Sequence, residues 1–405
     1  MGGFSWEASE LTTTDPAPAS APPRGFPISE FEARRERAQR LMAARGLDAL
    51  LVTTEPEVRY FSGFQSQFWE SPTRPWFLIV PRAGRPIAVI PEIGAAGMAE
   101  TWVEDIRTWP APQPEDDGVS LLAATLSERA TRFGRIGVPL GPETHLRMPA
   151  ADYARLIERL GNLEVADATG IVRALRDVKS PAEIDKIRYV CQLASDGFEA
   201  LPAAARIGDS EREVCRKLQL DLLRRGADST PYLIGASGPG GYDNIIMGPT
   251  GRILEAGDIL IIDTGTTYDG YFCDFDRNFA FGPASEPARR AHQVVYRATE
   301  AGIDAARPGA THEDLWAAMW QVLEAGGALG ETVGRLGHGL GMQLTEGASN
   351  KPGDRSVLEP GMVITIEPGM EFSPGKLMVH EENIAIGAGG AELLTQRAPP
   401  DLPLL

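Results

Sequence analysis

The chain contains little cysteine and little basic charge. Its 405 residues include three cysteines, at positions 191, 215 and 273, and no Cys-x-x-Cys pair. Such sparse cysteine excludes a disulfide-rich scaffold and fits a reducing cytoplasm. The 39 basic residues are outnumbered by 56 acidic ones, for a net charge of −17, whereas a nucleic-acid-binding surface needs clustered positive charge. We therefore expect a cytoplasmic protein with no nucleic-acid partner.

Long apolar runs are missing too. No stretch approaches the roughly 18 apolar residues that a membrane span needs, so we expect no membrane partner. The N-terminus lacks the basic start and apolar core of a secretory signal. Its proline, alanine, serine and threonine content instead predicts a flexible or extended arm over residues 1–28, which could equally lie across a neighbouring subunit.

The length exceeds what one hydrophobic core usually organises, so we expect two domains. In residues 29–175, helical and strand-like patterns alternate. A helix is expected over 29–45, and GLDALLVTTEPEVRYFSGF predicts a strand, a turn and an aromatic segment. Two strands should flank residues 82–85, and a helix should cover 150–160. This alternation predicts an α/β domain with a mixed sheet.

Residues 176–405 show paired helices and antiparallel strand patterns. Ser180, Pro181 and Glu183 form a helix-start signal at the domain junction. Gly226 is placed to end the next helix, and a Thr311–Asp314 capping box precedes a later one. This half is therefore expected to be an α+β domain. Its expected helices run over 181–205, 210–225, 286–306 and 312–325.

Two aspartates, Asp263 and Asp274, lie on the apolar strands of GDILIIDTGTTYDGYFCDFDRNFAFG. A buried, unpaired carboxylate is costly, and a bound cation removes that cost. In a hairpin, residues eleven apart can face each other across the two strands. Asp276 shares a face with Asp274 and is a rival ligand, a neighbour of the site or the partner of Arg277. Without a metal, the pattern indicates a turn aspartate and a salt-bridged one.

His338 stands between glycines in GRLGHGLGMQLTEG. The glycines let the backbone approach closely and leave the ring little to pack against, which favours a ligand histidine. The other histidines lack this setting, and they are His145, His292, His312 and His380. Two of them, His292 and His312, fall on predicted surface helices, where we expect them to be solvated.

Glutamates complete the pattern. Glu367 ends an alternating apolar strand just before Pro-Gly and shares a face with Thr365. Glu381 and Glu382 are adjacent, so at most one of them can point into a shared site. Four carboxylates and one imidazole suit a pair of hard or borderline divalent cations. Two such ions, roughly 3.5–4 Å apart, can activate a shared water.

These segments resemble those of the pita-bread metallohydrolases, the family of methionine aminopeptidase, aminopeptidase P, prolidase and creatinase. The matching segments are IDTGTTYDGYFCDFDR, GHGLG, LEPGMVITIEPG and HEEN, and the N-terminal half resembles the creatinase/prolidase N-terminal domain. The resemblance implies a pita-bread catalytic domain, a homodimer and two divalent ions per subunit (manganese, iron, cobalt or zinc). It also implies that Glu367 moves the proton during catalysis. The implied metal ligands are Asp263, Asp274, His338, Glu367 and Glu381.

Four positions depart from the family's proline peptidases, which carry accessory histidines and an arginine there. They hold Ile245–Ile246, Gly334, Thr345 and Val379. General acid–base assistance is worth roughly 10²–10⁴-fold in rate, so an active enzyme needs substitutes for these groups. The candidates are His380 and Glu346 as catalytic groups and Tyr242 and Asp243 as substrate-binding groups.

The leading hypothesis is a dinuclear-metal hydrolase that cleaves a C–N bond of a dipeptide-like or small modified amino-acid substrate, resembling Xaa-Pro peptidases, creatinase or ectoine hydrolase. One alternative is a lyase of the dimethylsulfoniopropionate-cleaving type, although those lyases carry an acidic residue where this chain has Gly265. A second is a non-catalytic binding module, which the full ligand set opposes. In creatinase-like dimers the N-terminal domain closes the partner's site, so Trp69 and Arg74 are expected to bind substrate; an ordinary core and salt-bridge role is the alternative.

Overall fold

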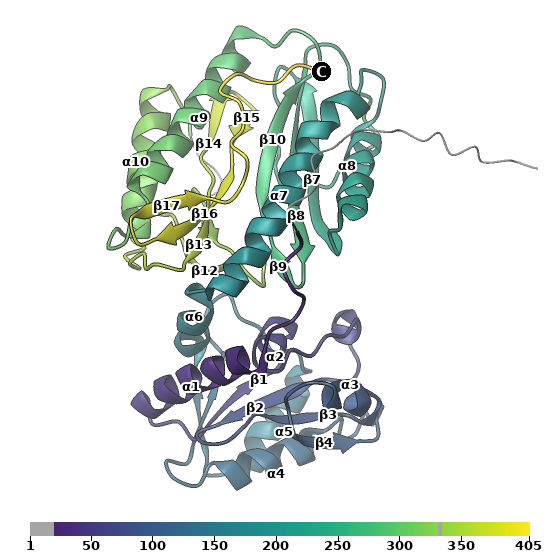
Figure 1. Cartoon of the computed structure of the whole chain (residues 1–405), viewed down its shortest axis with the longest axis vertical. Coiled ribbons are helices and arrows are strands. Elements are labelled where there is room, and N and C mark those ends of the chain that lie inside the picture. The colour runs from purple at the N-terminus through teal and green to yellow at the C-terminus, as the bar shows by residue number, and fades with distance from the viewer. Residues whose placement is uncertain (1–19, 331–333) are drawn as a thin grey trace, which may run out of the picture.

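The computed structural model describes residues 20–330 and 334–405, which form two lobes joined by a narrow waist (Figure 1). The N-terminal lobe is built on a six-stranded sheet in the order β4-β3-β2-β1-β5-β6. Neighbouring strands are antiparallel in β1–β2 and β2–β3 and parallel in β1–β5, β3–β4 and β5–β6, so the expected mixed sheet is confirmed. The strands are β1 (Ala49–Val52), β2 (Phe77–Pro81), β3 (Ile87–Pro91), β4 (Asp105–Trp109), β5 (Arg135–Val138) and β6 (Glu164–Asp167).

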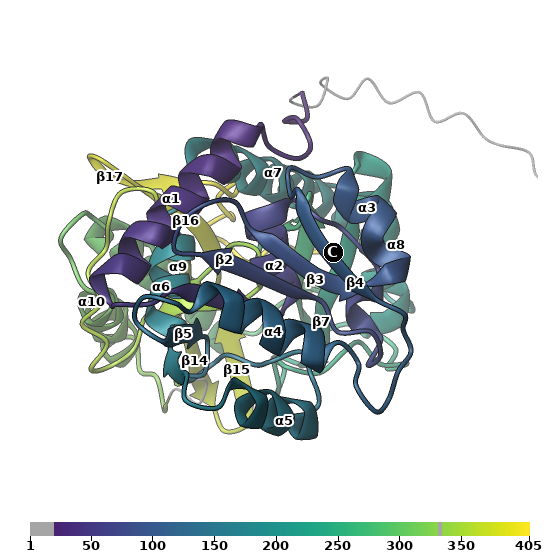
Figure 2. The same cartoon turned by 90° about the horizontal axis from the view of Figure 1, so that it is seen from below.

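Helices cover both faces of this sheet, as Figure 2 shows from below. Leu50 and Leu78 face a core shared with α1, whereas Leu51 and Ile79 face a core shared with α4 and α5. Burial on both faces explains why the central strands are apolar without alternation. The helices are α1 (Ile28–Ala44), α2 (Glu55–Ser62), α3 (Ala95–Ala99), α4 (Val119–Arg129) and α5 (Ala150–Leu160), with single turns η1 (Phe68–Glu70) and η2 (Glu92–Gly94).

The expected turn after β1 is wrong, because residues 55–62 form helix α2. Pro56 occupies its first turn, where a missing N–H costs nothing. Gly63 ends it in the left-handed region, with φ of +77°.

The second lobe begins at the junction helices and is α+β, as expected. Ser180 and Glu183 form the reciprocal capping box of α7, and Gly226 ends α8 with φ of +114°. Thr311 and Asp314 cap α10 in the same way. The helices are α6 (Thr169–Asp177), α7 (Pro181–Ala204), α8 (Glu211–Arg225), α9 (Glu286–Ala305) and α10 (His312–Ala325).

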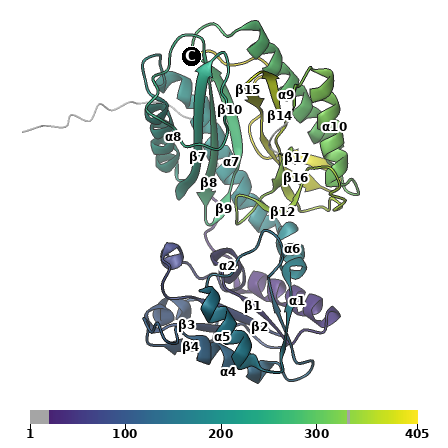
Figure 3. The ribbon, with the colours of Figure 1, turned by 180° about the vertical axis from the view of Figure 1, so that it is seen from behind.

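Two antiparallel sheets form the centre of this lobe. One joins β10, β8 and β7, with β9 paired to β8, and the other runs β12-β11-β13-β16-β17. Helices α7 and α8 cover one side and α9 and α10 the other, as the view from behind also shows (Figure 3). The strands are β7 (Ser229–Pro239), β8 (Asp258–Tyr268), β9 (Tyr271–Phe272), β10 (Phe275–Ala280), β11 (His338–Gly339), β12 (Glu346–Ser349), β13 (Val363–Ile366), β14 (Gly369–Ser373), β15 (Lys376–Val379), β16 (Glu382–Gly387) and β17 (Gly390–Leu393).

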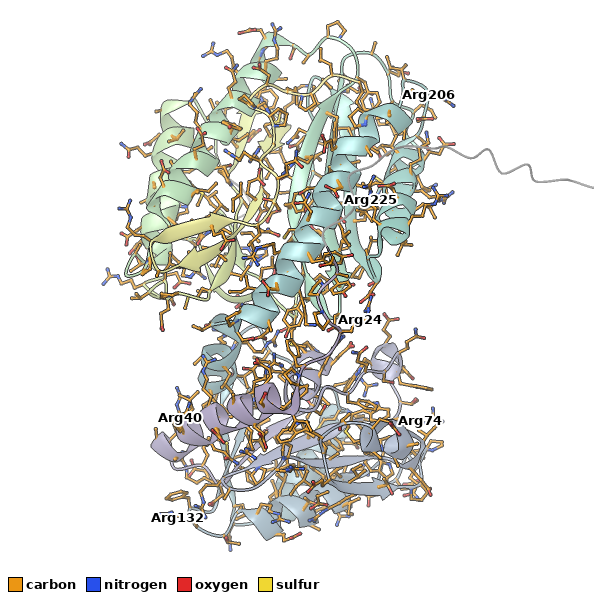
Figure 4. The ribbon with its side chains drawn as sticks, viewed as in Figure 1. Arg24, Arg40, Arg74, Arg132, Arg206 and Arg225 are labelled. Atoms are coloured by element: carbon orange, nitrogen blue, oxygen red, sulfur yellow. The ribbon has the colours of Figure 1, made fainter. Side chains whose placement is uncertain are left out.

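Residues 20–27 form an extended segment fastened at the waist. Arg24, labelled there in Figure 4, pairs with Asp228. The amide of Gly25 donates to Asp269 at 2.8 Å, and Phe26 packs edge-on against Tyr271. Residues 20–27 are therefore extended, one of the two forms expected for the arm, while residues 1–19 lie outside the described part of the chain. In that described part, no helix combines the length and apolarity that crossing a membrane requires.

Candidate metal centre

Three of the predicted ligands meet where the two sheets of the second lobe converge. Asp274 precedes β10, His338 opens β11 and Glu381 precedes β16. One ligand atom from each lies within 4.8 Å of the other two, and all three residues are buried. His338 Nε2 lies 3.4 Å from Asp274 Oδ2.

Asp263 lies on β8 beside this group, but not opposite Asp274 as expected. The strand register places Asp276 opposite Asp263. Asp274 lies just before β10, so the expected eleven-residue pairing is wrong by two residues. Asp276 is a buried carboxylate whose Oδ1 has no hydrogen-bond partner among the described residues. Burial is the main cause of its raised pKa, and the charge of Asp263 adds to the rise.

Glu367 follows β13 directly and joins the same group. Its amide donates to the carbonyl of Leu336 at 3.1 Å, next to the glycine that precedes His338. Its charge acts on His338, and it adds to the raised pKa of Asp263 and Glu381. All five predicted ligands are therefore neighbours in space.

The carboxylates are poorly compensated by the protein itself. Burial raises the pKa of Asp263, Asp274 and Glu381 well above their usual values, and mutual repulsion adds to the rise for Asp263 and Glu381. Each of the three carries an oxygen with no hydrogen-bond partner among the described residues. Buried acceptors without donors are expensive unless a cation satisfies them. The donor set, four carboxylates and one imidazole, therefore fits hard or borderline divalent cations.

His338 is oriented as a ligand histidine would be. Its Nδ1 lies 3.0 Å from the carbonyl oxygen of Gly339. A carbonyl only accepts, so Nδ1 carries the proton and Nε2 is left with a free lone pair toward Asp274. Burial lowers the pKa of His338, which keeps the ring neutral. The hydroxyl of Thr365, on the face shared with Glu367, accepts the His338 amide at 3.1 Å.

Three supporting residues escaped the sequence interpretation. The phenol of Tyr232 donates to Asp263, and its own pKa is raised by burial and then by the surrounding carboxylates. Asn383 accepts from the Asp274 amide at 2.9 Å and donates to its carbonyl. Arg335 is partly exposed, and its charge opposes the rise in the pKa of Asp274. The HEEN segment contained a signal for Asn383; Tyr232 and Arg335 had none.

Glu382 points away from the cluster, which separates it from Glu381. Arg277 lies 3.0 Å from one of its oxygens and Arg397 3.2 Å from the other. The possible Arg277–Asp276 side-chain pair is therefore wrong, because Arg277 gives Asp276 only a bond to its backbone carbonyl.

His380 turns away from the cluster as well. Its Nδ1 lies 2.9 Å from the Thr299 hydroxyl, and burial, followed by the charges of Arg277 and Arg397, lowers its pKa well below the usual value. It lines a separate cavity of about 380 Å³ together with His292. The expected solvation of His292 and His312 is wrong, since they are 1% and 2% exposed. Each lies on the inner side of its helix.

The other predicted site residues lie on different parts of the molecule. Tyr242 is buried and bonds to Asn278 and to the amide of Val379. Asp243 is exposed and lines a surface cleft of about 480 Å³. Trp69 packs at 5.9 Å against Trp76 in the N-terminal core, and Arg74 lies at the edge of that lobe (Figure 4). Tyr242 lies within electrostatic reach of Asp263, whose charge adds to the rise in the pKa of the phenol, whereas Trp69 and Arg74 belong to the other lobe.

The four positions that lack family helpers differ among themselves. Ile246 is 77% exposed, and Gly334 has open space around its Cα. Val379 is buried. Thr345 accepts a hydrogen bond from Arg335 at 3.2 Å, which makes Arg335 the polar group that occupies this side of the centre.

Comparisons with known proteins agree with this geometry. Residues 34–178 match the creatinase/prolidase N-terminal domain and residues 185–388 match metallopeptidase family M24. The "Probable dipeptidase PepE" of Mycobacterium tuberculosis is 29% identical over 381 residues, covering 94% of this chain and 98% of the relative. The "Xaa-Pro dipeptidase" of Lactobacillus delbrueckii subsp. lactis is 25% identical over 360 residues, covering 87% and 93%.

Solved structures show the same fold. The dipeptidase PepE from Mycobacterium ulcerans superposes with a TM-score of 0.81 at 29% identity, covering 94% of this chain and 99% of that one. A prolidase from Thermococcus sibiricus gives 0.83 at 25% identity, covering 93% and 99%. The second lobe therefore has the pita-bread fold of these enzymes. Because one family model spans just over half of its 405 residues, the chain belongs to metallopeptidase family M24, a family of metal-dependent hydrolases.

Proposed function

We propose that the protein is a dinuclear-metal dipeptidase, which hydrolyses the C–N bond of a dipeptide or a dipeptide-like modified amino acid. One observation carries the proposal. Asp274, His338 and Glu381 each bring a ligand atom within 4.8 Å of the others, and Asp263 lies within electrostatic reach of Asp274. The three carboxylates in this group each keep an unpartnered oxygen among the described residues. Such an arrangement is unfavourable in a protein that holds no cations there.

The roles of the side chains follow from their positions. Asp263, Asp274, His338, Glu367 and Glu381 hold the cations, and the donors are compatible with manganese, iron, cobalt or zinc. Two such cations supply Lewis acidity and a water that ionises near neutral pH. Glu367, which is partly exposed, would accept a proton from the attacking water and pass it to the leaving amine. Tyr232 holds Asp263 in place, and Arg335 offers positive charge to a substrate carboxylate.

The relatives support a dipeptide substrate. Those named above are described as dipeptidases, and this chain aligns with nearly their whole length. The departures at Ile246, Gly334, Thr345 and Val379 support a preference wider than, or different from, Xaa-Pro. A buried His380 beside Thr299 supplies no proton to this site, so we assign it a structural role.

The proposal includes a homodimer in the cytoplasm. Trp69 and Arg74 belong to the N-terminal lobe, whereas the metal ligands belong to the second lobe, and in a dimer the two residues would border the partner's site. The three cysteines are free and buried, which suits a reducing compartment. Light scattering after gel filtration should give twice the chain mass of 43.6 kDa.

The proposal is tested by metal content and by products. The purified protein is loaded with manganese, cobalt or zinc, desalted and measured by plasma mass spectrometry, with about two ions per chain expected. A dipeptide panel that includes Xaa-Pro members is then assayed for free amino acids before and after chelation. A chain that keeps no ions, or cleaves no dipeptide in any loaded form, would falsify the proposal; an alkene product would indicate a lyase instead.

A further inference from the structure

A buried ion cluster at the junction of the lobes holds the segment that follows His338. Glu346 Oε1 lies 2.9 Å from Lys179 Nζ, and Arg176 binds Oε2. Arg176 also reaches Glu57 of α2 at 3.4 Å. The cluster therefore joins the N-terminal lobe, the junction and strand β12.

The charges in this cluster are fixed. Arg176, Lys179 and Glu346 are all less than a tenth exposed. Burial alone raises the pKa of Glu346, but Arg176 and Lys179 outweigh it and hold that pKa below the usual value. Both oxygens are paired with the side chains of Arg176 and Lys179, so this carboxylate is not available for the catalytic role suggested by the sequence.

The backbone around Glu346 fits tightly against the residue that follows the ligand histidine. Gly339, next to His338, pairs with Glu346 across β11 and β12. A Cβ on Gly339 would lie 2.1 Å from the Glu346 carbonyl oxygen, and one on Gly341 would lie 2.1 Å from its carboxylate. A Cβ on Gly347, whose φ is +73°, would lie 2.4 Å from the carboxylate of Asp177. A displacement of Glu346 is therefore transmitted to the histidine strand, since close-packed backbone cannot absorb it.

The same segment contacts two other parts of the metal centre. Thr345 accepts a hydrogen bond from Arg335, whose charge acts on Asp274 and His338. Leu344 Cδ1 occupies the space that a Cβ on Gly265 would need, two residues after Asp263. Residues 339–347 thus link the junction to the strands that carry Asp263 and His338.

We propose that Glu346 is a positioning residue, which with Arg176 and Lys179 sets the geometry of the metal centre from the domain junction. The inference rests on the proposed function. It predicts that loss of the Glu346 charge changes the coordination geometry and the turnover number, and does not merely loosen the fold.

A matched control exists elsewhere at the waist. Asp269 is an equally buried junction carboxylate, paired with Lys186 at 2.7 Å and with Arg59 at 2.8 Å. It lies in the β8–β9 turn at φ of +48°, a conformation that asparagine also adopts readily. Asp269→Asn therefore weakens a comparable ion cluster whose side-chain partners, Arg59, Lys186 and Gly25, lie outside residues 339–347.

The test compares Glu346→Gln, Arg176→Lys and Asp269→Asn with the unmodified protein, all loaded with cobalt. The visible absorption spectrum of the bound cobalt reports ligand geometry, and dipeptide kinetics and melting temperature are measured in parallel. We expect both cluster variants to show a shifted cobalt spectrum and a kcat lowered roughly 10–100-fold, with KM nearly unchanged. Asp269→Asn should melt earlier but keep the spectrum and kcat.

Two outcomes would overturn the positioning role. One is a Glu346→Gln or Arg176→Lys protein whose spectrum and kcat match those of Asp269→Asn. The other is a loss of kcat that follows the melting temperature across all three variants. If Glu346→Gln does not fold, Arg176→Lys decides, because lysine keeps the charge but cannot bond to Glu57 and Glu346 with two separate nitrogens as the guanidinium does. Unmodified protein that cleaves no dipeptide would refute the proposed function alone, since the cobalt spectra still test the positioning role.

Discussion

At the scale of single residues, Asn383 fixes a metal ligand by its backbone. Its amide side chain bonds to both the N–H and the carbonyl of Asp274. Substitution of groups that orient ligands typically costs about 10–100-fold in metal affinity. We expect Asn383→Ala to weaken metal binding by about that factor, measured by titration against a competing chelator.

The control for Asn383 is Cys191, a neighbour that bonds to the same amide side chain. Cys191 donates to Asn383 at 3.3 Å but does not touch Asp274. Cys191→Ala should lower stability and leave metal affinity within about twofold. Equal loss of affinity in both variants would mean that the packing of α7, and not the hold on Asp274, sets the affinity.

Arg335 is the residue that we expect to recognise the negative charge of the substrate carboxylate. Its guanidinium bonds to the neutral hydroxyls of Thr345 and Ser349 and lies within electrostatic reach of Asp274 and His338. A hydrogen bond to a charged group is worth about 1.5–3 kcal/mol, or roughly 10–100-fold in binding. Arg335→Gln should raise KM for a dipeptide by that factor.

The matching substrate is a dipeptide amide, which lacks the terminal carboxylate. Arg335→Gln should change its KM by less than about threefold, and Arg335→Lys should recover part of the loss for the free dipeptide. Equal effects on both substrates would place Arg335 with the metal ligands and not with the substrate.

Sequence reasoning reached the ligands because their chemistry is unusual for their setting. Asp263 stands on an apolar strand, Glu367 directly follows one and His338 stands between glycines, and these settings can be recognised from the sequence alone. Asp276 and Glu382 could not be resolved in this way, since the register of β10 and the reach of Arg277 are properties of the folded chain. Arg335 and Tyr232 carry no local pattern, because their roles depend on Asp274 and Asp263, which are distant from them in the sequence.

At the scale of elements, the long helices follow from their caps. Ser180 and Thr311 each begin a helix at the start signal that the sequence indicates, and Ser210 begins α8 with the same reciprocal bonds. Helix α2 was missed because its eight residues give too few turns for a 3.6-residue pattern to show. The extended form of segment 20–27 is among the forms that the sequence indicates, but its contacts with α1 and with the turn after β8 are not, because they depend on how the lobes pack.

That segment gives a prediction at this scale. Phe26 packs edge-on against Phe31 and Tyr271, and the guanidinium of Arg34 lies 4.3 Å from its ring centre. Loss of a partly buried aromatic ring and its cation–π contact should cost about 2–3 kcal/mol. We expect Phe26→Ala to lower the unfolding free energy by that amount in urea denaturation.

Metal affinity should stay the same in Phe26→Ala, since the ring touches no residue of the cluster. Phe26→Leu, which keeps apolar volume but not the ring, should recover part of the stability. An unfolding free energy unchanged by Phe26→Ala would show that the segment contributes nothing to the joint between the lobes.

At the scale of the whole molecule, two domains and their classes follow from the sequence, but the joint between them does not. Glu57, Arg176 and Asp269 read as ordinary surface charges in a linear sequence. Their burial depends on how the lobes pack, which no local pattern encodes. The second lobe contains a cluster of buried carboxylates with unpartnered oxygens. That cluster should determine how the stability of the whole protein changes with pH.

In the metal-free protein, burial raises the pKa of Asp263, Asp274 and Glu381 above the unfolded values of about 4. The folded state therefore binds more protons than the unfolded state above pH ~4, and this contribution to stability is lost as the pH rises through the folded pKa values. His338, whose pKa burial lowers, acts in the opposite sense near pH 6.5, but it is one group against three. Divalent cations compete with the same protons, so metal affinity should increase with pH.

The measurable result is the difference in melting temperature between metal-saturated and chelator-treated protein. This difference should widen from pH 5 to pH 8, because bound metal stabilises the fold in proportion to the logarithm of its affinity. Titrating groups far from the centre, such as His292 and His312, contribute to both forms and cancel in the difference. Asp263→Asn removes one of the competing protons and should flatten the dependence on pH. A difference that stays constant from pH 5 to pH 8 would mean that the carboxylates are already ionised without metal, which the buried, unpartnered oxygens of the cluster contradict.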